Sequence, residues 1–111
     1  SMLEKSQEER RNREYEVSLV NVLKNTYQGI EEIKITKPDY TNPPGSWSCD
    51  VEIKFIDEKT LKYGINHHLS YKTNYGGRQE TNEDWQYLET HKGQTLNSVK
   101  ITYSDSEQGE L

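Results

Sequence analysis

Cys49 and His67 are the two residues in this sequence whose chemistry would be most reactive if they met. A thiol beside an imidazole is the basis of a cysteine nucleophile. Both fall on the same face of two predicted neighbouring strands, and a register in which paired numbers sum to 116 places them opposite each other. Cysteine is nevertheless among the most often buried residues, and a histidine on an apolar face is usually a packed core residue. No helix N-terminus or glycine-rich loop is expected beside Cys49, so a quiet core thiol is the favoured interpretation.

A second candidate is the carboxylate pair Asp50 and Glu52, two residues apart on the polar face of one predicted strand. Two such carboxylates could serve as general acid and base. Lys54 and Lys62 are expected beside them, and cross-strand charge pairs of this kind are ordinary on a solvated sheet face. A small hydrolase that uses Cys49 with His67, or Asp50 with Glu52, is therefore the alternative hypothesis.

Metal and phosphate chemistry find little support in the sequence. His67 and His68 are adjacent, so in a strand they point to opposite faces, and His91 lies too far along the chain to complete a metal motif. The run Gly76-Gly77-Arg78 lacks the spacing of a phosphate-binding loop. The sequence predicts no metal, no cofactor and no catalytic residue.

Composition limits the class of partner. The 111 residues include 14 Lys and Arg against 19 Asp and Glu, which gives a formal charge of −5. A protein that binds duplex nucleic acid needs a basic face, so no nucleic-acid partner is expected. Only 30% of the residues are hydrophobic, which predicts a thin core, although eight tyrosines and two tryptophans add buried area. The single cysteine excludes an intramolecular disulfide, and no apolar run is long enough for a membrane helix.

An amphipathic helix is predicted over residues 15–27. Tyr15, Leu19, Val22 and Leu23 follow helical spacing, and Gly29 supplies a stop. Residues 1–13 are expected to combine a cleavage scar at residues 1–2 with a polar helical extension or tether.

The period then changes to two, which predicts four half-buried strands. Their inward residues are Ile33 and Ile35, then Trp47 to Phe55, then Leu61 to Tyr71, and finally Val99 to Tyr103, at alternate positions in each run. Such alternation indicates an antiparallel sheet with one wet face. We therefore expect an α+β domain over residues 14–105, with the helix covering the dry face and residues 106–111 as a tail.

Two connections are less regular. Residues 57–59 are expected to join the second and third strands in a register summing to 116 or 118. Residues 82–92 form either a helix or an extra strand. The capping pattern at residues 81–84 favours a short helix that carries Trp85 and Leu88 inward.

The chain resembles the small, tandem-type lipoproteins of Gram-positive bacteria, whose function is unknown. The resemblance covers about half of the chain and lies in Asn-Thr-Tyr-x-Gly-Ile at residues 25–30, the strand at 31–36 and Asn-Pro-Pro-Gly-Ser at 42–46, where the family reads Asn-Pro-Met-Gly-Ser. It implies a cystatin-like fold with a helix on a sheet. It also implies an extracytoplasmic domain held on the membrane by an N-terminal lipid absent from this sequence, and a cytoplasmic location is the alternative.

The leading hypothesis is a non-enzymatic domain that binds a protein or cell-envelope partner; a narrower form is an immunity protein against a basic toxin. If the strands form a meander, loops 37–46 and 72–81 share one end of the sheet and form a rim. Rigid loops with tyrosine and arginine suit an interface. The competing site is the polar sheet face that bears Asp50, Glu52, Lys54 and Lys62. The predicted contact residues of the rim are Tyr40, Pro43, Pro44, Tyr75 and Arg78.

Overall fold

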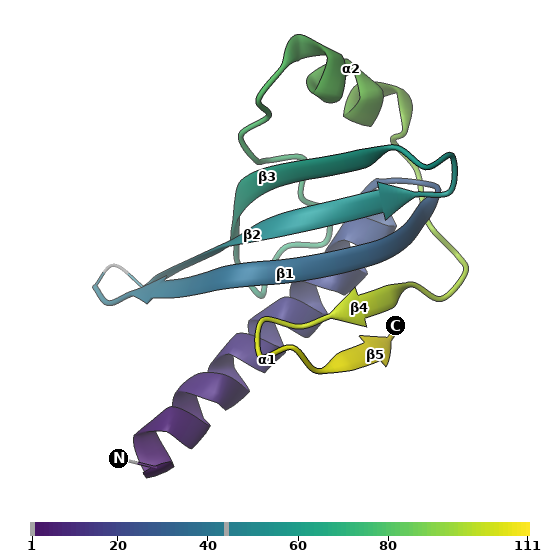
Figure 1. Cartoon of the computed structure of the whole chain (residues 1–111). Helices are drawn as coiled ribbons and strands as arrows, with labels where there is room; N and C mark the ends of the chain where they lie inside the picture. The colour runs from purple at the N-terminus through teal and green to yellow at the C-terminus, as the bar shows by residue number, and fades with distance from the viewer. Residues whose placement is uncertain (1, 44) are drawn as a thin grey trace.

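One long helix lies across the back of a twisted sheet, and a short helix stands beyond the sheet's far edge (Figure 1). The computed structural model describes residues 2–43 and 45–111. The elements in chain order are α1 (Met2–Thr26), β1 (Ile30–Thr41), β2 (Ser46–Phe55), β3 (Thr60–His67), α2 (Asn82–Thr90), β4 (Lys100–Thr102) and β5 (Gln108–Glu110). The α+β class and the helix-on-sheet layering are confirmed.

The sheet has five strands in the order β3-β2-β1-β4-β5, so the expected four-stranded antiparallel sheet is wrong. β4 pairs with β1 in parallel, which makes the sheet mixed, and β5 completes a hairpin with β4. Residues 106–111 are therefore part of the fold, since Val99 and Leu111 also exchange two backbone hydrogen bonds. β4 and β5 have three residues each, too few for a clear alternation in the sequence.

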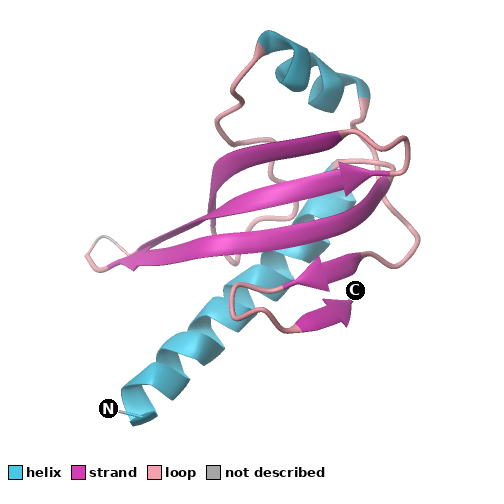
Figure 2. Cartoon of the chain, in the orientation of Figure 1, coloured by secondary structure: helices cyan, strands magenta, loops and turns pink. Residues whose placement is uncertain are grey.

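α1 begins well before the predicted helix, and its first turns project beyond the sheet (Figure 2). It joins the domain earlier than expected. The Trp47 indole N–H donates to the Asn12 side chain over 3.1 Å, and Arg13 forms ion pairs with Asp105 and Glu107. The prediction that residues up to 13 form only a solvated extension is thus wrong for residues 11–13.

β1 runs to Thr41, so most of the predicted loop at 37–46 is strand. The strand continues past Pro38 because two residues, Lys37 and Pro38, face one residue of β2 in a β-bulge. Lys37 adopts a positive φ of 53° there. β4 pairs only with residues 32–34 of β1, so Pro38 lies where β1 has no second strand partner and its missing N–H is tolerated.

β2 and β3 pair in a register in which residue numbers sum to 114, so both predicted registers are wrong. The hairpin closes one residue earlier: the Phe55 N–H donates to the Lys59 carbonyl, and Glu58 takes the left-handed position of a three-residue turn with φ 74°. Because the sum stays even, every side chain keeps its predicted face.

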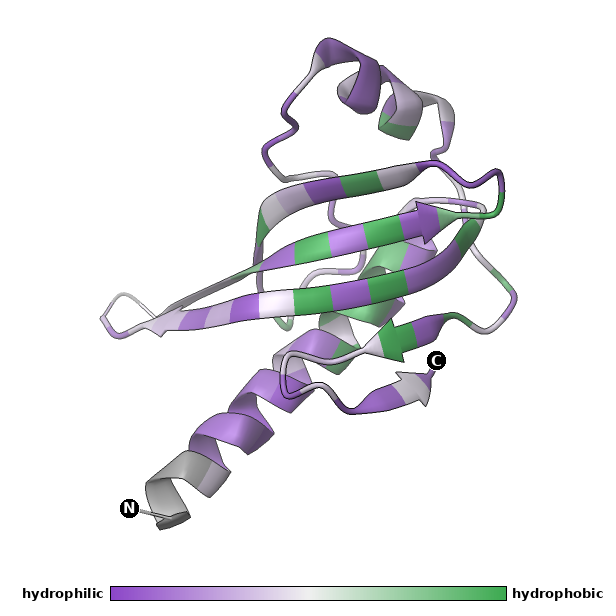
Figure 3. Cartoon of the chain, viewed as in Figure 1, coloured by the Kyte–Doolittle hydropathy of each residue, from purple (hydrophilic) through white to green (hydrophobic). Residues whose placement is uncertain are grey.

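The predicted alternation matches the buried core. Figure 3 shows the same alternation of hydrophobic and hydrophilic residues along the strands. The exceptions follow the end of β3 at His67, after which Leu69 and Tyr71 are exposed. Residues 82–90 are helical, with Thr81 as N-cap, but only Leu88 is buried while Trp85 is 56% exposed. α1 is therefore the main cover of the dry face, and α2 adds Leu88 to the same core.

Candidate functional site

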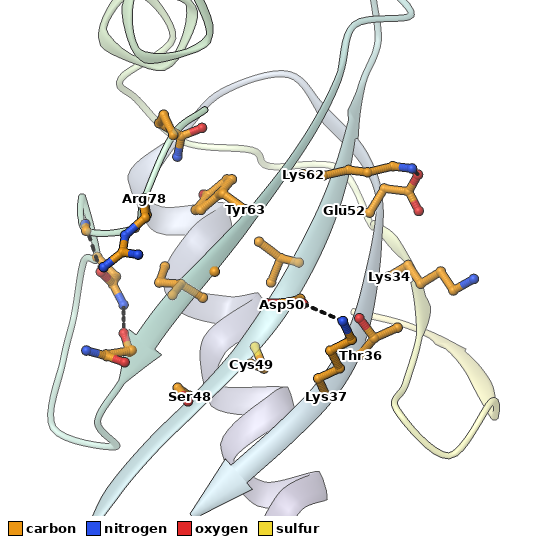
Figure 4. A pocket seen from close by; sticks show the side chains of 18 of the residues that line it. Lys34, Thr36, Lys37, Ser48, Cys49, Asp50, Glu52, Lys62, Tyr63 and Arg78 are labelled. Carbon is orange, nitrogen blue, oxygen red and sulfur yellow. Dashed lines mark hydrogen bonds and ion pairs between the residues drawn. The ribbon is translucent and has the colours of Figure 1, made fainter. Parts of the chain in front are cut away.

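The polar face of the sheet carries an open hollow of about 990 Å³, which we call the groove (Figure 4). Its floor is formed by outward positions of β1, β2 and β3, and its wall by residues 74–80, which run beside β3. Most of the side chains that line it are charged, amide or hydroxyl groups. The polar sheet face and the segment at residues 74–80 thus form this concavity together.

Gly64 makes the floor of the groove deep. It occupies an outward position of β3 opposite Asp50, where any other residue would project a side chain into the hollow. A Cβ at Gly64 would meet its nearest neighbour, Asp50 Oδ1, at 3.4 Å, which is ordinary contact. The backbone therefore has room for a Cβ at this position. Glycine is needed here only to keep the groove deep.

The wall is held by backbone contacts. The Arg78 N–H donates to the Gly64 carbonyl, and the side chain of buried Asn74 donates to the Asn66 carbonyl. The Asn74 N–H in turn donates to Thr26 Oγ1 of α1 over 2.9 Å. Gly77 has φ 116° and lies so close to the Tyr63 ring that an added Cβ would come within 2.5 Å of it. These contacts fix residues 74–78 against the edge of β3.

Charges on this face form two rows across the strands. In one row Lys62, Glu52 and Lys34 face one another on β3, β2 and β1. In the next, Lys54, Glu32 and Lys100 do the same on β2, β1 and β4. Each row has one carboxylate between two lysines, but Lys54 also lies 3.8 Å from Glu31 and 3.5 Å from Glu58, so the excess of positive charge is clearest in the Lys62–Glu52–Lys34 row.

The ion pairs within these rows are long and exposed. Lys62 lies 3.5 Å from Glu52, and Glu32 lies 3.8 Å from Lys54 and 3.9 Å from Lys100. Outside the rows, Lys37 lies 3.8 Å from Asp50. Exposed pairs of this kind each contribute about 0–1 kcal/mol, so a ligand can replace them at little cost.

A second hollow of about 250 Å³ adjoins the groove and shares Lys34 and Glu52 with it. Together the two hollows are lined by six cationic and four anionic side chains, a balance of +2. The other eight cationic and fifteen anionic residues of the chain therefore carry −7. The groove is a locally basic area on an acidic protein.

The predicted rim does not form. Tyr40 lies against the N-terminal half of α1, with its ring 6.3 Å from Tyr15 and under the Arg11 guanidinium. Tyr75 packs edge-on against Tyr27, which directly follows the last residue of α1. At 1.5 Å per helical residue, this end of α1 is about 18 Å from Tyr15, so Tyr40 and Tyr75 contact opposite ends of that stretch. Of the five predicted contact residues, Arg78 alone lines the groove; Pro43 is exposed at the β1–β2 turn and Pro44 lies outside the described residues.

Cys49 and His67 do not face each other across the β2–β3 pair. Cys49 faces Ile65 and His67 faces Trp47, so the predicted opposition is wrong by one pair of residues. The thiol is buried, and burial raises its pKa far above the usual range, with smaller contributions from Glu16 and Asp50. Asp50 and Glu52 do line the groove, but each lies beside a lysine.

Two polar residues of α1 with structural roles went unpredicted. Glu16 is only 1% exposed and accepts hydrogen bonds from the Ser104 N–H and hydroxyl; desolvation raises the pKa of its carboxyl. Ser18 Oγ lies 2.9 Å from His67 Nε2. Glu16 and Ser18 flank the apolar stripe, where polar residues are usually solvated, so the helical pattern gave no signal for them.

The described residues contain no cluster of three or more His, Cys, Asp or Glu side chains placed to hold a metal ion. Neither described helix is long and apolar enough to cross a membrane. No protein-family model matches the chain, and neither the curated proteins nor the solved structures compared with it gave a match. The function must therefore be argued from the groove.

Proposed function

We propose that this chain is a non-enzymatic binding domain that holds a protein or a cell-envelope component in the groove. The observation that carries the proposal is the hollow of about 990 Å³ over Gly64, beside a wall whose backbone is fixed to β3. A solvated sheet face needs neither a glycine at its centre nor an ordered wall. Pre-formed concave surfaces with a few convergent polar groups are typical of ligand sites.

The alternative function is a small hydrolase based on Asp50 and Glu52. Each of these carboxylates has a lysine ammonium group within 4 Å, the arrangement of an ordinary charge pair on a solvated sheet face. The Cys49 version would need an accessible thiolate, but the thiol is buried. These observations favour binding over hydrolysis.

An extracytoplasmic location with an N-terminal lipid, and kinship with cystatin-like folds, are parts of the same proposal. They are supported by the resemblance at residues 25–30 and 42–46 and by the helix on the β1–β3 sheet. The parallel β1–β4 pair departs from the antiparallel sheet that we expected with it. A leader with a lipidation cysteine in the native gene supports this location, and a gene that starts at this helix contradicts it.

The narrower hypothesis of immunity against a basic toxin would use a different surface. The groove lining is net cationic, whereas the outward face of α2 carries Glu89 and the exposed Trp85. Acidic groups around an exposed tryptophan suit a basic partner with an apolar pocket. Loss of toxin binding by Trp85→Ala, with Gly64→Val unaffected, would assign that function to α2.

Gly64→Val tests the groove directly. The substitution places a β-branched residue in a strand, so folding is expected to be unchanged or slightly more stable, while its methyl groups fill the floor. Amide chemical shifts of ¹⁵N-labelled protein are followed while peptides, oligosaccharides and small metabolites are added. We expect at least one class to shift Ser48, Gly64 and Asn66, and Gly64→Val to abolish that response while Gly64→Ala weakens it less. Responses confined to other surfaces would contradict the proposal.

A further inference from the structure

We propose that the groove binds an extended acidic peptide segment of a partner protein, with glutamates or aspartates at alternate positions. This inference rests on the proposed function and adds the chemistry of the ligand. Three observations carry it: the local charge, the two cations that have no carboxylate partner in the described part of the chain, and the spacing of the two lysine rows.

The local charge selects an anion. The groove and the hollow beside it carry +2, while the rest of the chain carries −7. A cationic ligand would meet more attraction almost anywhere else on the molecule. An anionic ligand is repelled by most of the surface and attracted to this face, so the charge distribution both selects and orients it.

Two cations are available without breaking an ion pair. Among the described residues, ion pairs engage Lys37, Lys54, Lys62 and Lys100 but neither Lys34 nor Arg78. Lys34 and Arg78 lie on opposite sides of the groove, on β1 and on the wall (Figure 4). The backbone of Arg78 is fixed by its bond to Gly64 while its guanidinium is exposed, an arrangement that suits a carboxylate.

The spacing of the rows selects an extended peptide. The Lys62–Glu52–Lys34 row and the Lys54–Glu32–Lys100 row are two residues apart along the strands, which corresponds to about 6.8 Å. Side chains on one side of an extended peptide recur at the same interval. Along one strand the two rows alternate in sign, with Lys34 next to Glu32 on β1. A segment that crosses the strands at a slant, from Lys34 on β1 to Lys100 on the neighbouring β4, therefore places alternate carboxylates over a lysine of each row.

The test uses two fluorescein-labelled octapeptides of identical composition, one alternating Thr-Glu four times and the other, called the block peptide, with the order Glu-Thr-Thr-Glu-Glu-Thr-Thr-Glu, in which no two glutamates are two positions apart. Fluorescence anisotropy is measured with the whole chain at low salt and pH 7. We expect the alternating peptide to bind about fivefold more tightly than the block peptide, and Lys34→Gln and Lys100→Gln each to weaken it about fivefold. Arg10→Gln removes one positive charge from the exposed part of α1, outside the groove, and should leave the dissociation constant unchanged.

Each other outcome has a definite meaning. Equal binding of the two peptides, or equal loss in Arg10→Gln, would reduce the effect to general electrostatics and overturn the inference. Tighter binding of hyaluronan oligosaccharides would assign the groove to an anionic glycan and also overturn it. A neutral or cationic ligand that shifts Gly64 and is blocked by Gly64→Val would leave the proposed function standing without an acidic peptide. Peptide binding that shifts only residues outside the groove would refute both proposals.

Discussion

His67 shows how burial changes the chemistry of a single residue. Its ring is 3% exposed, bonds to Ser18 through Nε2, contacts Tyr71 edge-on, and has no hydrogen-bond partner for Nδ1 among the described groups. Desolvation, with a smaller contribution from His68, lowers its pKa to about 4. His67 is therefore neutral at pH 7 and acts as a packed core group.

This burial predicts a pH dependence of stability. Unfolded histidine titrates near pH 6.5, so between about pH 6.5 and 4 the unfolded chain binds more protons at this residue than the folded chain. The stabilising contribution is complete above pH 6.5 and is lost as the pH falls to about 4, an effect on the order of 3 kcal/mol. Urea unfolding from pH 7 to pH 4.5 should show this slope, and His67→Gln should reduce it.

Comparison with the variant isolates His67 from other groups. The raised pKa of Glu16 gives a slope of opposite sign just above pH 4.5, because there the folded state binds the extra proton. That contribution is common to both proteins and cancels in the difference. Identical slopes for the wild type and His67→Gln would show that His67 titrates normally in the fold.

Cys49 should be inert to thiol reagents. It is 3% exposed, and the raised pKa leaves almost no thiolate at neutral pH. Ellman's reagent at pH 7 is therefore expected to react only after denaturation, at a rate limited by opening of the fold. Rapid labelling of the native protein would restore Cys49 as a candidate nucleophile.

At the scale of an element, the wall beside β3 depends on Gly77. Both its positive φ and its contact with Tyr63 exclude a side chain. Gly77→Ala should therefore lower the free energy of unfolding by about 2 kcal/mol or more, or release residues 74–78 from the edge of β3. Gly64→Ala is the matched control, because its Cβ makes only ordinary contacts. Amide hydrogen exchange at Arg78 separates loss of the wall from global destabilisation, and unchanged protection would contradict the role assigned to Gly77.

α1 provides a second prediction about elements. Leu19 and Leu23 are fully buried between the helix and the sheet. Leu23→Ala, or Leu19→Ala, should cost about 2–5 kcal/mol, as large-to-small core substitutions do. Val17→Ala, at a partly buried position of the same helix, should cost less. Chemical denaturation measures all three, and an equal loss for Val17→Ala would mean that the helix packs differently.

The sequence predicted the faces of side chains better than it predicted the edges of elements. Alternation assigned Trp47, Cys49 and Ile53 to the dry face because positions buried on one side of a sheet are filled by apolar residues. Strand order has no such pattern in residue type: the three residues of β4 pair with β1, and the paired residues Glu32 and Lys100 are 68 positions apart in the chain. The polar face that carries the groove was predicted as the competing site, but its hollow was not, since a glycine in a strand marks a close approach or a hollow only after its neighbours are known.

At the scale of the whole molecule, the two terminal segments contribute differently to the free energy of unfolding. Hydrogen bonds and ion pairs described for side chains of residues 6–10 stay within α1, so removal of residues 1–10 should cost under about 1 kcal/mol. Removal of residues 106–111 eliminates β5, the Val99–Leu111 bonds and one carboxylate partner of Arg13. We expect that loss to exceed about 2 kcal/mol in urea unfolding. Equal costs would mean that the β4–β5 hairpin adds little.

The parallel β1–β4 pair also has a consequence for synthesis in the cell. The ribosome delivers Lys100 of β4 68 residues after Glu32 of β1, an interval of about 3–14 s at roughly 5–20 residues per second. During those seconds β1, β2 and β3 are completed and can pair, whereas one edge of β1 waits without its neighbour. Farther along that edge, Pro38 and the bulge at Lys37 interrupt the ladder that a neighbouring nascent chain would need. The bulge therefore shortens the regular stretch of β1 with which a neighbouring chain could pair before β4 is made.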